Sequence, residues 1–189
     1  MTKPVSFLVL ALFCALCIAS CGLFGNIRTI TFPDGSKYVG EIKDSMKHGY
    51  GKMTWVNGDS YEGQWAVDKI QGTGVFIWSN GNKYDGQWAA NQRQGQGTMT
   101  EKSGATYAGQ WEANRRSGEG TYTLPGGGSY SGAWKNDEKN GTGVMTWPDG
   151  SRYEGGWKDG KRHGQGIMTG ADGKTVEKGK FLNDVFVGK

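Results

Sequence analysis

The sequence is poor in the residues from which compact domains and catalytic or metal sites are usually built. It has only two histidines, three cysteines and four prolines in 189 residues, and hydrophobic residues make up 35% of it. That hydrophobic share is below the usual range for a domain with a closed core, so we expect a thin sheet with little interior. The formal net charge of +4 is too small to indicate nucleic-acid binding.

Long apolar runs are also scarce, and the one that exists lies near the amino terminus. After Lys3, the run Val5–Ile18 (VSFLVLALFCALCI) has 14 residues. It is shorter than the ~20 residues that cross a bilayer and has the length of a signal-peptide core. The sequence therefore predicts a cleaved export signal.

The run ends in Ile18-Ala19-Ser20-Cys21, which resembles the lipobox of bacterial lipoproteins, although that family prefers leucine where Ile18 stands. The resemblance implies cleavage after Ser20 and a Cys21 that carries a thioether-linked diacylglycerol and an N-acyl chain. Several acyl chains anchor a protein stably, where one does so marginally. An ordinary cleaved secretory signal is the alternative.

The predicted processing accounts for every cysteine. Cys14 and Cys17 fall in the removed segment 1–20, which leaves Cys21 at the start of a lipidated terminus and short linker, 21–28, so we expect neither a disulfide nor a cysteine metal site within one chain. Loss of Lys3 lowers the net charge from +4 to +3. Gly22 is not the aspartate that resembles an inner-membrane retention signal, so we expect a lipid-anchored protein of the bacterial cell envelope, at the outer membrane if there are two membranes.

Glycine and aromatic residues, in contrast, are abundant and regularly spaced. There are 34 glycines, and aromatic residues make up 12% of the chain. Six tyrosines recur at intervals of 23 residues: Tyr38, Tyr61, Tyr84, Tyr107, Tyr130 and Tyr153. A fixed period of this length indicates a repeat protein.

The unit beginning at Tyr61 shows how each repeat is expected to fold. YEGQW, Tyr61–Trp65, reads as one strand, AVDKIQ as a polar loop, GTGVFIW as a second strand and SNGNK as a turn. Asn-Gly between two strand-like runs is a strong hairpin signal. The pattern predicts an antiparallel meander with tight turns along one edge and longer loops along the other.

Alternation assigns the faces of this meander. Alternate residues of a strand point to one side, so Tyr61, Gly63 and Trp65 share a face, which Phe76 and Trp78 are expected to join. We infer that the recurring strand glycine leaves space for neighbouring rings to lie flat. At two strands per repeat and about 4.8 Å per strand, six repeats give a bent ribbon roughly 60 Å long.

Each unit has the pattern Y-x-G-x-W, followed after six residues by G-x-G and then by a turn glycine. This pattern resembles the MORN repeat (membrane occupation and recognition nexus) over Thr29–Phe181. The units start at residues 38, 61, 84, 107, 130 and 153. Ile42 departs from the pattern at the strand tryptophan, and Glu101 and Gly170 depart at the second-strand aromatic. The resemblance implies an all-β, elongated, open, single-layer antiparallel meander over residues 29–181, preceded by the signal peptide and followed by a tail, 182–189.

Two surfaces are candidates for binding. A one-layer sheet has no second layer to cover its rings, so the first is the aromatic face, which either covers itself or binds a protein, a second copy or a glycan: Tyr61, Trp65, Tyr84, Trp88, Tyr107, Trp111, Tyr130, Trp134, Tyr153 and Trp157. The second is the loop edge, whose eleven basic residues outnumber six acids and would attract anionic lipid: Lys43, Lys47, Lys69, Arg93, Arg115, Arg116, Lys135, Lys139, Lys158, Lys161 and Arg162.

Residues for catalysis are not brought together by the repeat. His48 and His163 occupy equivalent loop positions five repeats apart, nearly 50 Å at the strand spacing, so they share neither a metal nor a proton. The G-x-G pairs precede strands rather than helices and are not phosphate loops. We expect no enzymatic activity, metal or cofactor. The sequence predicts a scaffold that binds a protein or itself through the aromatic face, with anionic lipid or envelope glycan as the alternative ligand.

Overall fold

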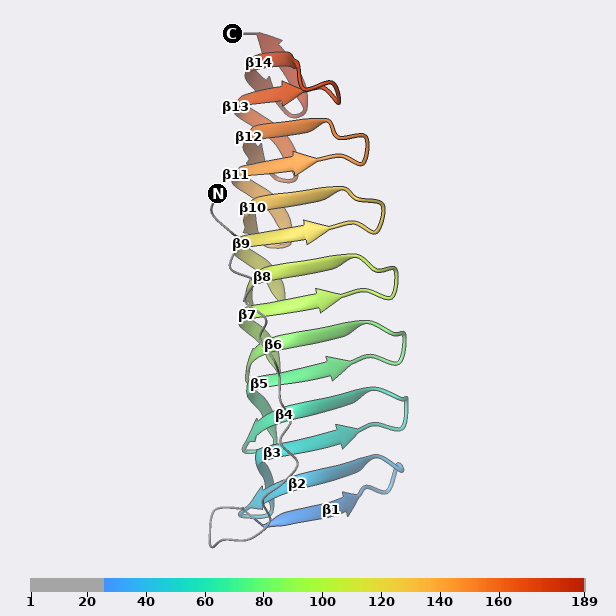
Figure 1. Cartoon of the computed structure of the whole chain (residues 1–189). Coiled ribbons are helices and arrows are strands. Elements are labelled where there is room, and N and C mark those ends of the chain that lie inside the picture. The colour runs from blue at the N-terminus through green and yellow to red at the C-terminus, as the bar shows by residue number, and fades with distance from the viewer. Residues whose placement is uncertain (1–25, 189) are drawn as a thin grey trace, which may run out of the picture.

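The computed structural model describes residues 26–188, which form one antiparallel sheet of fifteen strands in chain order (Figure 1). The strands are β1 (Ile27–Thr31), β2 (Lys37–Lys43), β3 (Met46–Thr54), β4 (Ser60–Ala66), β5 (Lys69–Ile77), β6 (Lys83–Ala89), β7 (Gln92–Thr100), β8 (Thr106–Glu112), β9 (Arg115–Thr123), β10 (Ser129–Lys135), β11 (Glu138–Thr146), β12 (Arg152–Lys158), β13 (Lys161–Thr169), β14 (Thr175–Leu182) and β15 (Val185–Gly188). The predicted all-β, open, antiparallel meander is confirmed. The described part contains no helix long and apolar enough to cross a membrane.

The sheet is longer than the predicted range 29–181. It begins at Ile27, and residues 185–188, predicted as part of a tail, form β15, which pairs with β14 through Phe181 and Phe186. The predicted signal peptide and Cys21 lie outside the described residues, so they stay predictions.

The two kinds of turn are the reverse of the prediction. Most of the expected loop AVDKIQ is strand, and only Val67 and Asp68 connect β4 to β5, both with positive φ (51° and 62°). Two consecutive left-handed residues are the geometry of a tight hairpin turn, which aspartate and asparagine tolerate. The Asn-Gly segment instead lies in a five-residue connection, closed by hydrogen bonds between Trp78 and Asn82 and from the amide of Gly81 to the carbonyl of Trp78.

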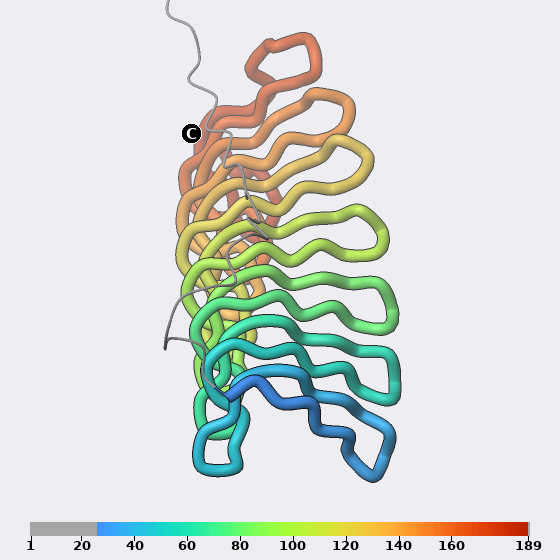
Figure 2. The backbone as a smooth tube through the Cα atoms, turned by 60° about the horizontal axis from the view of Figure 1, so that its bottom comes forward, coloured from blue at the N-terminus to red at the C-terminus, as the bar shows by residue number. Residues whose placement is uncertain are grey.

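Each hairpin that a two-residue turn closes, from β2–β3 to β12–β13, is bent near its middle. Gly63 of β4 pairs with Gly74 of β5, and the next pair is Trp65 with Ile70, so one residue of β4 faces three of β5. Such a bulge bends a strand, and here it places Gly72 at a φ of +67°, which glycine adopts at least cost. Figure 2 shows the result: a long arm runs to the five-residue turn, while a short arm, ending in the two-residue turn, curls back.

The tyrosine rings fill the inside of this bend, over the strand glycines. A Cβ on Gly63 would lie 2.5 Å from both Tyr61 Oη and the Cα of Gly74. The Tyr61 hydroxyl donates a hydrogen bond to the carbonyl of Gln64 (3.1 Å). The predicted role of glycine as the space for a ring is therefore confirmed.

Tyrosine and tryptophan rings alternate along the ribbon and join neighbouring hairpins. Tyr61 makes edge-to-face contacts with Trp65 of its own unit (5.2 Å) and Trp88 of the next (5.7 Å). Each such pair contributes about 0.5–1.5 kcal/mol beyond its buried area. The indole N–H of Trp88 also donates to the carbonyl of Gly74 in the preceding hairpin (3.2 Å). The core is thus a continuous row inside the bend.

The glutamine of YEGQW has a role that the sequence did not reveal. On the opposite face, the side-chain oxygen of Gln64 accepts a hydrogen bond from the amide of Thr73, a residue of the bulge (2.8 Å), and Gln87 does the same for Gln96 (2.7 Å). Ala133 occupies this position in the fifth unit and has no oxygen to offer. The glutamine therefore satisfies a backbone donor that the bend removes from the ladder.

Candidate binding groove

The ten residues predicted as a binding face form the core of the protein. Their exposed fractions are at most 7%: Tyr61, Trp65, Tyr84, Trp88, Tyr107, Trp111, Tyr130, Trp134, Tyr153 and Trp157. The burial agrees with the alternative that the rings cover themselves and corrects the expectation that a one-layer sheet leaves them uncovered, because the short arm folds back over them. Binding at these ten residues stays a prediction, and the accessible surface beside them belongs to other residues.

A second row of hydrophobic side chains packs against this core and remains half-buried. It comes from the ends of the nine-residue strands and the first residue of each long connection: Trp55, Phe76, Trp78, Met99, Tyr122, Met145, Trp147 and Met168. We call the space between this row and the short arms the groove. It is open in the central hairpins.

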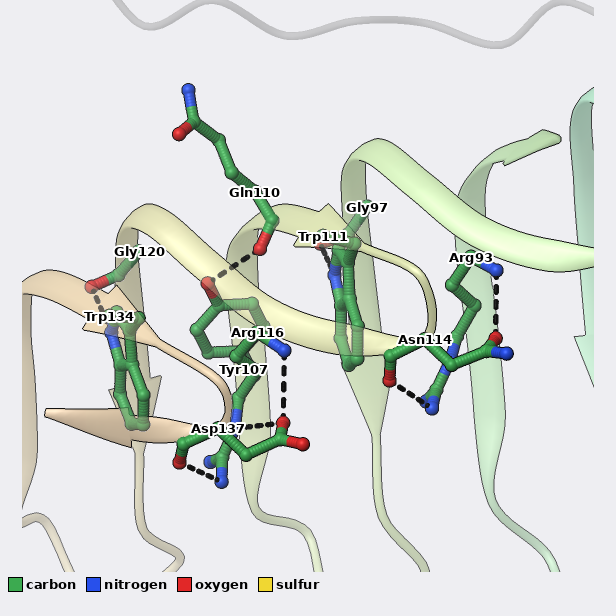
Figure 3. Close-up of polar contacts among 10 residues, drawn as sticks. All are labelled: Arg93, Gly97, Tyr107, Gln110, Trp111, Asn114, Arg116, Gly120, Trp134 and Asp137. Atoms are coloured by element: carbon green, nitrogen blue, oxygen red, sulfur yellow. Dashed lines mark hydrogen bonds and ion pairs between the residues drawn. The ribbon is translucent and has the colours of Figure 1, made fainter. Parts of the chain in front are cut away.

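Cations of the short arms form the opposite wall of the groove. The Arg93 guanidinium lies 4.4 Å from the Trp111 ring and that of Arg116 lies 4.4 Å from Trp134 (Figure 3). The Lys139 ammonium lies 4.0 Å from the Trp157 ring. A cation over an indole face is stabilised by the ring quadrupole. Lys47 and Arg162 occupy equivalent positions, so five of the eleven cations predicted to line an outer edge turn inward.

The two-residue turns fix these cations in place. For four of the five cations, the second residue of the next hairpin's turn accepts a hydrogen bond from the cation's backbone N–H, as Asn114 Oδ1 does from Arg93 (2.9 Å) and Asp137 Oδ1 from Arg116 (2.9 Å). Gly160 stands at this position opposite Lys139 and makes only the backbone bond, from its N–H to the Lys139 carbonyl (3.0 Å).

The cations consequently differ in how they are neutralised. Arg116 forms an ion pair with Asp137 at 3.2 Å, and Lys47 and Arg162 are also paired with carboxylates, Asp68 and Asp184. Arg93 faces the neutral Asn114, donating to its carbonyl (2.7 Å), and within residues 26–188 neither Arg93 nor Lys139 has an ion-pair partner. Burial lowers the pKa of Arg93 and of Lys139. These two are the groove cations left for an external anion.

Two recesses open in the central part of the groove. One of about 250 Å³ is lined by Arg93, Met99, Glu101 and Tyr122 among others, and one of about 390 Å³ by Tyr122, Leu124, Lys139 and Met145 among others. Both include Arg116, Tyr122 and Asp137, so they adjoin.

Larger hollows lie on the outer face, but their chemistry is different. The hollow of about 660 Å³ over β12–β14 is lined by Glu154, Gln165, Ile167, Lys178 and two glycines. No aromatic residue lines it, and ligand sites are usually apolar clefts with a few placed polar groups. The groove recess lined by Tyr122, Leu124, Met145 and Lys139 fits that description better.

Sequence comparison identifies the repeat. The MORN repeat model matches six consecutive segments: residues 38–60, 61–83, 84–106, 107–129, 130–152 and 153–175. These cover residues 38–175 without a gap, well over half of the chain. The chain belongs to the MORN-repeat family. No curated protein sequence is significantly similar to it.

Solved structures show only a distant likeness to this MORN-repeat sheet. The TCP domain of Drosophila melanogaster SAS-4 (dCPAP), in complex with a proline rich motif of Ana2, is 15% identical, with 85% of this chain and 94% of that one covered and a TM-score of 0.44. The TCP10 domain of Danio rerio CPAP, in complex with a STIL peptide, is 14% identical, with coverages of 82% and 94% and a TM-score of 0.32. Likeness at this level carries no functional conclusion.

Tyrosines and histidines of the MORN repeats are the remaining titratable groups near the core. Burial raises the pKa of the Tyr84 phenol to about 12, and the protonated hydroxyl donates a hydrogen bond to the backbone carbonyl of Gln87 (3.0 Å). His48 and His163 lie on β3 and β13, ten strands apart, and Nδ1 of His163 is buried without a hydrogen-bond partner. Within residues 26–188, no cluster of three or more His, Cys, Asp or Glu is placed to hold a metal ion.

Proposed function

We propose that this MORN-repeat chain is a non-enzymatic scaffold of the bacterial cell envelope, anchored through a lipid on Cys21, that binds a protein partner in its central groove. The observation that carries the proposal is the pair of adjoining recesses, which combine a half-buried hydrophobic wall with cations held over indole rings. Apolar contact area with a few oriented polar groups is the usual composition of a recognition site.

Photo-crosslinking in cells tests the groove. A photoreactive amino acid at Met99 or Tyr122 faces the groove, whereas one at Thr121 on the outer face is the matched control. We expect a discrete adduct of one defined mass from the groove positions and none from Thr121. A second copy of this chain in that adduct would make the scaffold self-associating. Equal adducts from all three positions would contradict a groove site.

The anchor is tested separately. Cys21→Ser is expected to release the protein from the membrane or leave it unprocessed, because the acylated side chain is lost. Fractionation and mass spectrometry of the amino-terminal peptide measure this. Unchanged processing and membrane retention of Cys21→Ser would exclude lipidation.

Direct binding of anionic lipid is the competing proposal, and the geometry favours it less. Of the eleven predicted edge cations, six remain exposed (Lys43, Lys69, Arg115, Lys135, Lys158 and Lys161), against five exposed carboxylates at the same edge (Asp44, Asp68, Glu112, Glu138 and Asp159). The exposed excess is therefore one positive charge rather than five. Vesicles with anionic lipid distinguish the two, because such binding weakens steeply with salt whereas groove binding retains its apolar part.

A further inference from the structure

We infer that the partner segment in the central groove is an extended, acidic chain in the polyproline II conformation, with carboxylates six residues apart opposite Arg93 and Lys139. This inference rests on the proposed function and names the chemistry of the partner at the same site. It follows from the repeat distance of the groove and from which of its cations are unpaired.

The repeat distance selects the conformation. Successive hairpins place equivalent groove residues two strands apart, about 9.6 Å. Three residues of polyproline II advance about 9.3 Å and complete one turn, so every third side chain points at the next hairpin. Three residues of a β-strand advance about 10 Å but point to opposite sides. Two turns of α-helix also return the same face, but they advance about 10.8 Å and are about 2.4 Å out of step after two hairpins. Polyproline II is out of step by only about 0.6 Å over the same two hairpins, so it matches the repeat best.

The unpaired cations select the charges. Arg93 lies on β7 and Lys139 on β11, four strands or about 19 Å apart. Six residues of polyproline II span about 18.6 Å. Between them, Arg116 is already paired with Asp137. The partner therefore needs acids at positions i and i+6 only.

The middle position of such a segment faces apolar surface. Tyr122 lies between the two recesses, with Met99 in one and Met145 in the other. An aliphatic side chain at i+3 fits between these residues. Glu101 lines the first recess from the opposite wall and repels a carboxylate there, which confines the acid at position i to the side of Arg93.

Capped synthetic peptides test this inference with the full chain in detergent. The probe has the sequence PDPPLPPDP with a fluorescent label, and its controls place the two aspartates four or five residues apart or replace both with lysine. Fluorescence anisotropy at low salt is expected to show at least fivefold tighter binding for the six-residue spacing. Equal affinity across the spacings would overturn the inference.

Matched variants assign the charges. Arg93→Gln and Lys139→Gln are each expected to weaken binding of the probe by about three- to tenfold, the range of one charge-assisted contact, and Arg93→Lys is expected to recover most of the loss. Lys135→Gln removes an exposed cation outside the recesses and is expected to leave binding unchanged. Arg93→Glu combined with Lys139→Glu is expected to transfer the preference to the lysine peptide. Equal losses from Arg93→Gln and Lys135→Gln would contradict the assignment.

The two proposals fail in distinguishable ways. If no peptide binds at millimolar concentration while crosslinking at Met99 still gives a discrete adduct, the polyproline II inference is wrong and the groove proposal stands. If the groove positions also give no adduct, both are wrong. Thermal unfolding of each variant confirms that it is folded before its affinity is read.

Discussion

The amino-terminal and central hairpins share one core, but the groove is filled by side chains in the first region and open in the second. In the amino-terminal part, Phe76 packs between Trp55 (5.4 Å) and Trp78 (4.6 Å), so the protein's own rings occupy the space beside the core. In the central hairpins the equivalent positions carry Met99 with Glu101 and Tyr122 with Leu124, and the recesses open there. The Tyr-Gly-Trp core thus sets the fold, and the second row decides whether a hairpin has room for a ligand.

The largest expected effect breaks what the two regions share. A Cβ on Gly86 would lie 2.5 Å from the Cα of Gly97, and one on Gly63 lies equally close to Gly74. Gly86→Ala and Gly63→Ala should each lower the free energy of unfolding by about 3 kcal/mol, because backbone must move. Gly126→Ala, with nothing within 4 Å of its Cβ, should change it by less than about 0.5 kcal/mol. Urea denaturation measures all three, and a mild effect at Gly86 would contradict the packing role of glycine.

A double substitution can give a central hairpin the second-row residues of the amino-terminal region. Met99→Phe with Glu101→Trp reproduces the Phe76 and Trp78 pair. It should fill the first recess and weaken binding of the PDPPLPPDP peptide at least tenfold, or about 1.4 kcal/mol, without lowering the melting temperature. Thr98→Val, on the outer face, is the control. Full affinity in the filled variant would place the ligand elsewhere.

A smaller effect on stability is expected at the bulge glutamine, which most units have and the fifth unit lacks. Gln87→Ala should cost about 1 kcal/mol of stability, since the Gln96 amide loses its acceptor. Ala133→Gln should give back a similar amount by supplying the oxygen that the fifth unit lacks. Urea denaturation of the two single variants checks the opposite signs, and two changes of the same sign would refute the assigned role.

The smallest expected effect concerns the turn opposite Lys139. Gly160 has a φ of +79° and open space around its Cβ position, a conformation that asparagine tolerates. Gly160→Asn should stabilise the protein by about 0.5 kcal/mol by accepting the Lys139 amide, as Asn114 does for Arg93. Gly160→Asp should stabilise the protein similarly, but it should also neutralise Lys139 and weaken binding of the acidic peptide. Comparison of the two variants therefore separates the effect of the backbone hydrogen bond from the effect of the charge. Equal peptide affinity in the two variants would remove Lys139 from the site.

Much of this fold was predicted from local patterns, because strand alternation and the 23-residue period can be read from the sequence without knowledge of tertiary contacts. The shared face of Tyr61, Gly63 and Trp65 and the glycine spaces followed from them directly. The bend did not, since it depends on one residue of β4 opposing three of β5. The only sequence signal was the unequal length of the two strands in each unit.

The candidate site was less accessible to sequence reasoning for the same reason. Without the bend, the rings of Trp88 and Trp111 were expected either to cover one another or to face a partner, and Arg93 was placed on the loop edge. The tight turn at Val67 and Asp68 was missed because valine is not a typical turn residue, and the φ values there are imposed by the hairpin. Side chains that depend on the neighbouring hairpin for their surroundings were the ones misplaced.

Because each indole reaches back to a carbonyl of the hairpin before it, a hairpin's requirements are met entirely by the one preceding and the one following. Insertion or deletion of a whole 23-residue segment would therefore keep the contacts of all hairpins away from the junction, exchange partners only at the junction and change the span in steps of about 10 Å. Duplication of a repeat within the gene can therefore lengthen such a molecule without changes in the sequence of the other repeats.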